Sequence, residues 1–226
     1  MKLIVAGSGS SGNSYILTNG EEALVLDAGL PFMTVKKALD FNVRCIKGVV
    51  VTHSHGDHAK YAREYEEVGI PVWKPYEDEN LRQSRQLGSF TIRSFEAVHN
   101  VPCVGYLIQH EEIGRMLYVT DTEYVPFRFK GLSTMLIEMN YSDEYIDRNA
   151  VKFRHVLQGH LEKQTALDCI RANMNENLVH IILCHLSPDG SNEIEFMEAV
   201  KGIVPGYVTV DVARPGLTVG VDNIPF

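Results

Sequence analysis

Short apolar runs alternate with turn residues along the chain, and amphipathic segments with apolar positions every three or four residues lie between them. The short runs predict β-strands at Lys2–Ala6, Ser14–Leu17, Ala23–Asp27, Ile46–Thr52, Pro71–Trp73, Phe90–Val98, Val104–Gln109, Arg115–Thr120, Thr134–Met139, Val179–Cys184, Tyr207–Asp211 and Leu217–Val219. The amphipathic segments predict α-helices at Phe32–Phe41, Ala59–Val68, Tyr76–Leu87, Asp143–Val156, Glu162–Met174 and Glu193–Gly202. The early strands come as hairpin-like pairs, which argues against a purely parallel sheet. We therefore predict an α/β fold in which one domain, residues 1–226, has two sheets with helices outside.

Composition and charge narrow the class of protein. The 226 residues are 45% hydrophobic and 22% charged, as expected of a soluble globular domain. The N-terminal apolar run, Leu3–Ala6, is too short for a signal peptide, and no segment approaches a membrane span. The four cysteines form no C-x-x-C pair, which is typical of buried thiols in a reducing cytoplasm. The net charge of −8 predicts weak non-specific binding to nucleic acid, although two divalent cations would reduce it to about −4.

A group of metal-binding side chains follows the strand predicted at Ile46–Thr52. Residues 53–58 read His-Ser-His-Gly-Asp-His, so four candidate ligands lie within six positions: His53, His55, Asp57 and His58. Imidazole and carboxylate together suit zinc, manganese or iron rather than calcium or magnesium. Because an open tetrahedral ion takes only three protein ligands, we predict two divalent ions, zinc or manganese. The alternative is a solvated loop that happens to contain histidines.

A second motif, near the N-terminus, resembles a nucleotide-binding loop only in its letters. Residues 7–12 fit G-x-G-x-x-G, but a dinucleotide site needs a helix to begin at the third glycine. Here Ser14–Thr18 reads as a strand that ends in a turn at Asn19-Gly20. The sequence therefore predicts a tight loop whose backbone N–H groups could approach a phosphate.

Three further candidate ligands, His99, Asp121 and His185, each follow directly after an apolar strand. Taken singly, such residues are more often structural histidines or turn aspartates. Together with the hexapeptide they complete the coordination of two ions, which favours a metal site at one edge of a sandwich.

In this order the residues resemble the metallo-beta-lactamase superfamily. The resemblance implies a four-layer αβ/βα sandwich with a dinuclear site at one edge. It implies the ligands of the first ion (His53, His55 and His99), those of the second ion (Asp57, His58 and His185) and a bridging Asp121. Val25–Gly29 matches the first motif of the family, in which the aspartate, here Asp27, supports the ligands without binding metal. A turn role for Asp27 is an equal alternative.

Within this superfamily the chain is similar to the YycJ/WalJ-like proteins, which are regarded as DNA exonucleases. The similar segments are Gly7–Ser14, Glu138–Tyr141, Gly159–Leu161, and His185–Ser187 with Asn192. Two positions depart from the subgroup: Asn100 replaces a usual aspartate, and Tyr141 stands where histidine is common. These departures bear on the size of the substrate and the polarity of cleavage.

The resemblance also implies roles in catalysis. Two ions about 3.5–4 Å apart can share a water, lower its pKa toward 7 and present hydroxide to phosphorus. Asp57 and His160 are the predicted catalytic residues, since nuclease members use a comparable Gly-His element to contact the scissile phosphate. His160 would begin a helix and either hold the phosphate or protonate the leaving oxygen. A histidine that caps the helix or faces solvent is the alternative.

Other polar residues are predicted to support this site. Ser187 and Asn192 could add hydrogen bonds to a phosphate, although a turn over residues 188–191 explains them equally well. Glu138 ends an apolar strand and could orient a ligand histidine. The remaining histidines are predicted to be structural or to lie on the surface: His110, His155 and His180.

The leading functional interpretation is a metal-dependent phosphodiesterase that cleaves nucleic acid, DNA from an end. A phosphodiesterase of small molecules such as cyclic nucleotides is the second, favoured by the acidic pI of about 5.6. Hydrolysis of a thioester or lactam is the third. A metal-binding sensor or redox protein, or a non-catalytic binding module, is disfavoured because every expected ligand is present. The residues leave the metal, the cleavage polarity and the oligomeric state open, with a homodimer among the options.

Overall fold

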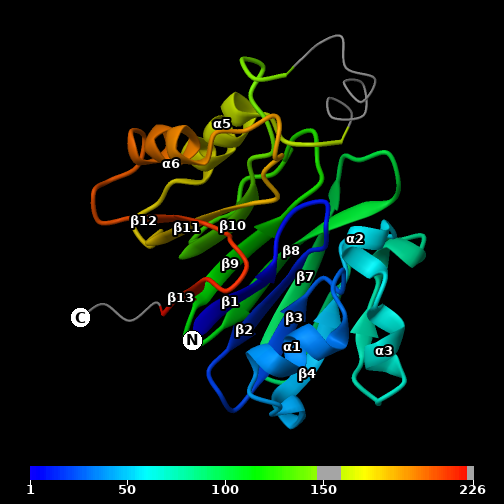
Figure 1. The fold of residues 1–226 in the computed structure, drawn as a ribbon. Coiled ribbons are helices and arrows are strands. Elements are labelled where there is room, and N and C mark those ends of the chain that lie inside the picture. Colours follow the sequence, from blue (N-terminus) through cyan, green and yellow to red (C-terminus); the bar gives the residue numbers. More distant parts are fainter. Residues whose placement is uncertain (147–158, 223–226) are drawn as a thin grey trace.

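Two β-sheets lie face to face at the centre of the computed structural model, which describes residues 1–146 and 159–222 (Figure 1). The first sheet has the order β13-β1-β2-β3-β4-β5, with β1 (Lys2–Gly7), β2 (Ser14–Thr18), β3 (Ala23–Leu26), β4 (Ile46–Val50), β5 (Val72–Trp73) and β13 (Thr218–Gly220). The second has the order β12-β11-β10-β9-β8-β7-β6, with β6 (Ser84–Leu87), β7 (Phe90–Ala97), β8 (Cys103–His110), β9 (Gly114–Val119), β10 (Thr134–Glu138), β11 (His180–Cys184) and β12 (Thr209–Val212).

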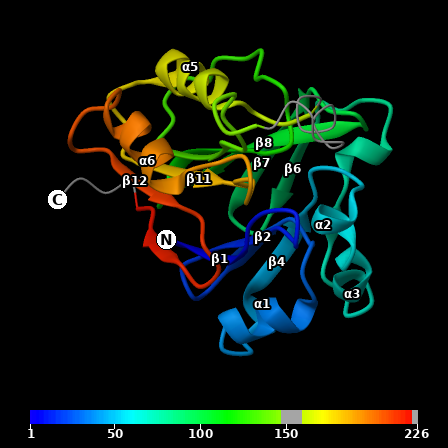
Figure 2. The same cartoon turned by 45° about the horizontal axis from the view of Figure 1, so that its top comes forward.

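Helices cover the outer faces of both sheets. The first sheet is covered by α1 (Phe32–Ala38), α2 (Gly56–Ala59) and α3 (Ala62–Glu66), and the second by α5 (Lys163–Asn173) and α6 (Glu193–Lys201). Figure 2 shows α1 and α3 on one side of the paired sheets and α5 on the other. This arrangement confirms the predicted αβ/βα sandwich.

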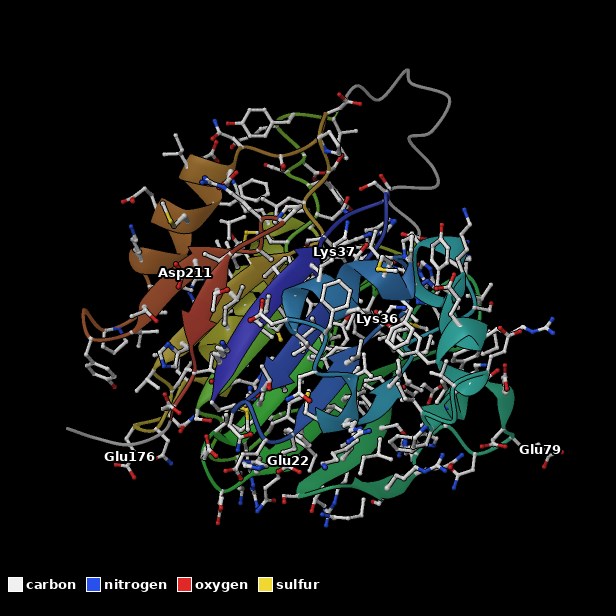
Figure 3. All side chains as sticks on the ribbon, turned by 60° about the horizontal axis from the view of Figure 1, so that its bottom comes forward. Glu22, Lys36, Lys37, Glu79, Glu176 and Asp211 are labelled. Atoms are coloured by element: carbon white, nitrogen blue, oxygen red, sulfur yellow. The ribbon has the colours of Figure 1, made fainter. Side chains whose placement is uncertain are left out.

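Apolar spacing explains how these layers pack. In α1, Phe32 and Val35 are one turn apart and buried, whereas Lys36 and Lys37 lie on its outer side (Figure 3). The strand β7 alternates buried and exposed residues, as expected of a strand with one solvated face. The central strand β10 is buried at all five positions because the other sheet lies on one face and helices on the other. One apolar core fills the space between the sheets, and each helical layer has its own.

Strand direction brings the ends of several strands to one edge. The strands β9, β10, β11 and β12 are mutually parallel, and β3, β4 and β5 are parallel in the other sheet. Because β7 and β9 are both antiparallel to β8, they also run in the same direction. Residues that directly follow β7, β9 and β11 therefore lie along a single edge.

Two predicted helices differ from the structure, and a third is described only in part. The helix predicted at Tyr76–Leu87 is wrong: a short 3₁₀ turn (Pro75–Glu77) is followed by β6, whose backbone pairs with β7. The tertiary pairing with an edge strand overrides the local helical pattern. The helix predicted at Ala59–Val68 is two short helices, α2 and α3, and the first begins inside the hexapeptide. Of the helix predicted at Asp143–Val156, residues 143–146 include a turn and the rest lies outside the described residues.

Candidate metal centre

The hexapeptide turns sharply at the end of β4, so its side chains point to one place. His53 lies three residues after the end of β4, and His55, in extended backbone, precedes the single turn of α2, which contains Asp57 and His58. The two halves of the motif therefore lie on different backbone conformations. His53 and His58 are fully buried, whereas His55 and Asp57 are partly exposed.

All seven predicted ligands come together in two overlapping clusters, and a third group joins Glu138 and His160 to Asp121 and His185. Within each cluster the ligand atoms lie within 4.8 Å of one another. The first cluster contains His53, His55, His99 and Asp121, and the second contains Asp57, His58, Asp121 and His185. Asp121 belongs to both clusters. Its Oδ2 is 3.6 Å from His53 Nε2, and its Oδ1 is 3.5 Å from His58 Nε2.

Ring nitrogens within the clusters face one another, as the ligands of a shared cation would. Nδ1 of His55 faces two other imidazole nitrogens, at 3.0 Å from His53 Nε2 and 3.3 Å from His99 Nε2. Nε2 of His185 is buried, has no hydrogen-bond partner among the residues that the structure describes, and lies 3.5 Å from Asp57 Oδ2. A divalent cation would use the lone pairs of such nitrogens, and the mixed imidazole and carboxylate set suits zinc or manganese. The residues present therefore fit a metal site.

Buried carboxylates hold the ligand histidines from behind. Asp27 accepts hydrogen bonds from His58 Nδ1 (2.7 Å), from the Thr52 backbone N–H (2.8 Å) and from the hydroxyl of Tyr118. The bond to Nδ1 leaves the lone pair of His58 on Nε2, which faces the second cluster. Asp27 also has a positive φ of 61°, which fits the turn alternative, so it has both predicted features.

Glu138 supports the opposite side of the site. Its Oε1 accepts from His185 Nδ1 and from His160 Nδ1, each at 2.8 Å, and its Oε2 accepts from the Leu161 N–H at 3.1 Å. The carboxylate is fully buried, and although burial opposes ionisation, these donors lower the pKa of Glu138 to about 2. An ionised Glu138 therefore connects a predicted metal ligand to His160.

The two clusters differ in charge. Burial, followed by the neighbouring His58, holds the pKa of His53 far below its usual value. Burial also lowers the pKa of His99 to about 4, despite Asp121. Burial would lower the pKa of His185 as well, but Asp121 and other carboxylates outweigh it and raise the pKa to about 10. His53 and His99 thus offer neutral imidazoles, whereas His185 holds a proton that a cation would replace.

His160 lies beside the clusters but does not begin a helix. Its ring stacks on that of His185, with centroids 5.3 Å apart and an interplanar angle of 25°. The helix α5 begins three residues later and is capped by Glu162, whose side chain accepts from the Gln164 and Thr165 N–H groups. The prediction that His160 begins the helix is therefore wrong, whereas the helix predicted at Glu162–Met174 is confirmed, with Glu162 satisfying the first N–H groups.

The remaining predicted residues take part in local structure. Ser187 Oγ accepts from the Gly190 N–H at 3.1 Å, and Asn192 caps α6 by accepting from the Glu195 N–H at 3.2 Å. His110 pairs with Glu22 at 2.8 Å. Glu22, labelled in Figure 3, precedes β3, whereas Asp27 follows that strand, so this pair lies at the end of β3 away from the metal centre.

His180 contacts Thr209 Oγ1 at 2.7 Å. His155 lies outside the described residues.

Two contacts to the site were missed at the level of sequence. Thr52 lies between Asp27 and the ligands, with its Oγ1 3.0 Å from His53 Nδ1. Asn13 reaches the second cluster from the glycine-rich loop, with its Nδ2 2.9 Å from His58 Nε2. The position of Thr52 directly before the hexapeptide was the available signal. Nothing local indicates the contact of Asn13, which spans 45 residues.

The two-sheet fold and the histidine and carboxylate cluster at its edge define a metal-dependent hydrolase. The chain belongs to the metallo-beta-lactamase superfamily, whose family model matches residues 7–154, more than half of its length. It is 25% identical to the exodeoxyribonuclease YycJ of Bacillus anthracis, over 83% of each chain. It is 24% identical to the exodeoxyribonuclease WalJ of Streptococcus pneumoniae, over 98% of this chain and 91% of that protein. These matches confirm the predicted family and its similarity to the YycJ/WalJ-like subgroup.

A solved structure supports the fold alone. The metallo-beta-lactamase fold protein YhfI from Bacillus subtilis superimposes with a TM-score of 0.73 at 17% identity, covering 96% of this chain and 98% of that one.

Among the helices within residues 1–146 and 159–222, none is long and apolar enough to cross a bilayer.

Proposed function

We propose that this protein is a dinuclear metal-dependent phosphodiesterase that cleaves nucleic acid, with DNA hydrolysed from an end as its main activity. The single observation that carries the proposal is the pair of four-ligand clusters that share Asp121. The names of the relatives YycJ and WalJ support DNA as the substrate. Two zinc or manganese ions, when bound, would supply Lewis acidity and an activated water.

The protein's own groups would bind and orient the phosphodiester. Glu138 fixes Nδ1 of His160, and although burial lowers the pKa of His160, the nearby carboxylate outweighs it and raises that pKa. A protonated His160 beside the clusters could donate a hydrogen bond to a phosphate oxygen or a proton to the leaving oxygen. Asp57 has 23% of its side chain exposed and would accept a proton from the attacking water while it binds metal.

Ser187 and Asn192 remain proposed contacts to the phosphate. Since their side-chain oxygens already accept backbone N–H groups, only their donor groups are suited to this role. The four cysteines are all buried and unpaired, which supports a reducing compartment, and we place the protein in the cytoplasm.

A small-molecule phosphodiesterase is the second candidate. The net charge of −8 favours it, because a polyanion would be repelled outside the metal centre. The two candidates share their chemistry at phosphorus and differ in the size of the substrate. An assay with different substrates therefore distinguishes the two candidates, whereas the properties of the metal site do not.

The test is a panel of substrates assayed with manganese and with zinc: duplex DNA, single-stranded DNA, RNA, cyclic nucleotides and a thioester. Bound ions are counted in parallel by elemental analysis. We expect two ions per chain and release of nucleotides from DNA ends. Cleavage of cyclic nucleotides alone would exclude the nuclease, and one ion per chain would exclude the dinuclear site.

Variants assign the roles within the site. Asp57→Ala and His58→Ala should each lose one ion and nearly all activity. His160→Ala should keep both ions and lower kcat about 10²- to 10⁴-fold, as expected for loss of an acid or base group. His180→Ala is the matched control, since this histidine begins β11, at the opposite end of the strand from His185, and its ring contacts Thr209 Oγ1 on β12. Full turnover by His160→Ala with both ions bound would exclude its proposed role.

A further inference from the structure

The glycine- and serine-rich loop between β1 and β2 lies against the metal centre. This loop reaches the end of the molecule where α2 lies (Figure 1). The Asn13 N–H donates to the carbonyl of Asp57 at 2.7 Å, and Ser8 Oγ accepts from the His185 N–H at 2.9 Å. The loop thus contacts the backbone of two ligands of the second cluster.

Close packing fixes the loop at this position. The Gly29 N–H donates to the carbonyl of Asn13 at 3.0 Å. A Cβ atom at Gly29 would lie 1.7 Å from the carbonyl oxygen of Asp57 and 2.7 Å from the nitrogen of Asn13. Only glycine allows these three backbone segments to approach so closely. The position of Asn13 relative to Asp57 is therefore set by backbone contacts.

The hydrogen bonds of Asn13 also determine which way its amide points. Its side chain is fully buried, and its Oδ1 accepts from the Gly9 N–H at 2.8 Å and from the hydroxyl of Tyr15 at 3.2 Å. Because these two groups are donors, the oxygen must face them and the NH₂ group must face the cluster. Nδ2 lies 2.9 Å from His58 Nε2 and 3.4 Å from Asp57 Oδ2.

The second N–H of this amide faces His58 Nε2 at 2.9 Å and two oxygens of Asp57, the carbonyl oxygen and Oδ2, at 3.4 Å each. The first N–H bonds the Gly9 carbonyl at 3.1 Å. His58 donates its Nδ1 hydrogen to Asp27, so a cation would bind at its Nε2. With a cation there, the acceptors left to the Asn13 amide are both on Asp57. The carbonyl oxygen already accepts from the Asn13 backbone N–H at 2.7 Å, which leaves Oδ2 for the side-chain N–H.

We propose that Asn13 is a positioning residue for the second metal ion, its amide N–H orienting the Asp57 carboxylate toward the ion held by Asp57, His58 and His185. This inference rests on the proposed dinuclear site. Asparagine suits the position because aspartate lacks the N–H and would add a negative charge beside Asp57 and Asp121. The glycine-rich loop thereby has a role in metal binding, without binding a nucleotide.

The test compares metal affinities in wild type, Asn13→Ala and a matched control. Asn173→Ala is that control: it also removes a buried asparagine, which bonds the Phe129 N–H and the Cys169 carbonyl on α5. Each metal-free protein is titrated with Zn²⁺ or Co²⁺ against a competing chelator, giving the dissociation constants of the tighter and weaker ions. Urea unfolding of the metal-free proteins reports stability separately, and the Co²⁺ absorption spectrum reports ligand geometry.

We expect Asn13→Ala to weaken one of the two ions about 10- to 100-fold, as is usual for residues that orient ligands, and to leave the other within threefold. Its Co²⁺ spectrum should change only for the weakened ion, and Asn173→Ala should leave both ions unchanged. Equal weakening of both ions, or of neither, would overturn the role of Asn13. A single ion in wild type would instead refute the proposed dinuclear site. If metal-free Asn13→Ala has a higher free energy of unfolding than metal-free Asn173→Ala and still loses one ion, the loss of that ion is not caused by lower stability.

Discussion

Replacing Gly159 by alanine should displace a ligand of the first ion without touching the metal-binding atoms themselves. Gly159 lies behind the ring of His99, with a φ of +123° that residues other than glycine rarely adopt. A Cβ atom there would lie 2.3 Å from His99 Nδ1 and 2.7 Å from its Cε1. Since ordinary contacts need about 3.5 Å, the imidazole would have to retreat by roughly 1 Å.

Two effects of Gly159→Ala can be separated. The backbone strain should lower the free energy of unfolding by about 1–3 kcal/mol whether metal is present or not. The displaced ring should weaken the first ion by about 10- to 100-fold, because a ligand moved by 1 Å no longer fits its coordination geometry. Gly20→Ala is the matched control: its φ is +95° and no atom lies within 4 Å of the added Cβ, so it imposes strain alone.

The assay is chelator competition for both ions, with urea unfolding of the metal-free proteins. Gly20→Ala should lose stability and keep both affinities, whereas Gly159→Ala should lose stability and the affinity of one ion. If both variants keep both ions with wild-type affinity, the packing of Gly159 against His99 does not hold that ligand in place.

Three further perturbations follow from the same contacts. Gly29→Ala sets a Cβ 1.7 Å from the backbone oxygen of Asp57, so the metal-free protein should lose at least about 2 kcal/mol in urea unfolding; wild-type stability would contradict this packing. Burial raises the pKa of Glu22, but hydrogen bonds from His110 and a backbone N–H outweigh it and lower that pKa. Glu22→Gln should therefore lower the free energy of unfolding by about 1–3 kcal/mol at pH 7. The difference from wild type should disappear as the pH falls from about 4.5 through the lowered pKa, because wild-type Glu22 is then protonated too. If thermal melts show the same difference at every pH, the pairing of ionised Glu22 with His110 is refuted. Glu138→Gln puts an NH₂ donor where one carboxylate oxygen accepts, either from the two histidines or from the Leu161 N–H, so kcat on a phosphodiester should fall about 10- to 100-fold, and unchanged kcat would exclude its orienting role.

Most of the fold could be predicted from local patterns, because strands and helices leave a period in the positions of apolar residues. The fully buried run of β10 and the one-turn spacing of Phe32 and Val35 in α1 are examples. The pattern failed at Tyr76–Leu87, where edge pairing with β7 rather than local preference makes a strand. Pairing between strands depends on contacts that the local pattern does not contain.

The sequence by itself determined which residues could bind metal, because the hexapeptide combines ligand types and spacing that few other functions need. It also indicated His99, Asp121 and His185 as candidate ligands through their position after apolar strands. Only the tertiary structure decided how these ligands are divided and held. The division into two clusters, the support of His58 by Asp27, and the approach of Asn13 across 45 residues all depend on distances between distant segments. Those distances arise when two sheets pack on a shared core, and no local pattern encodes them.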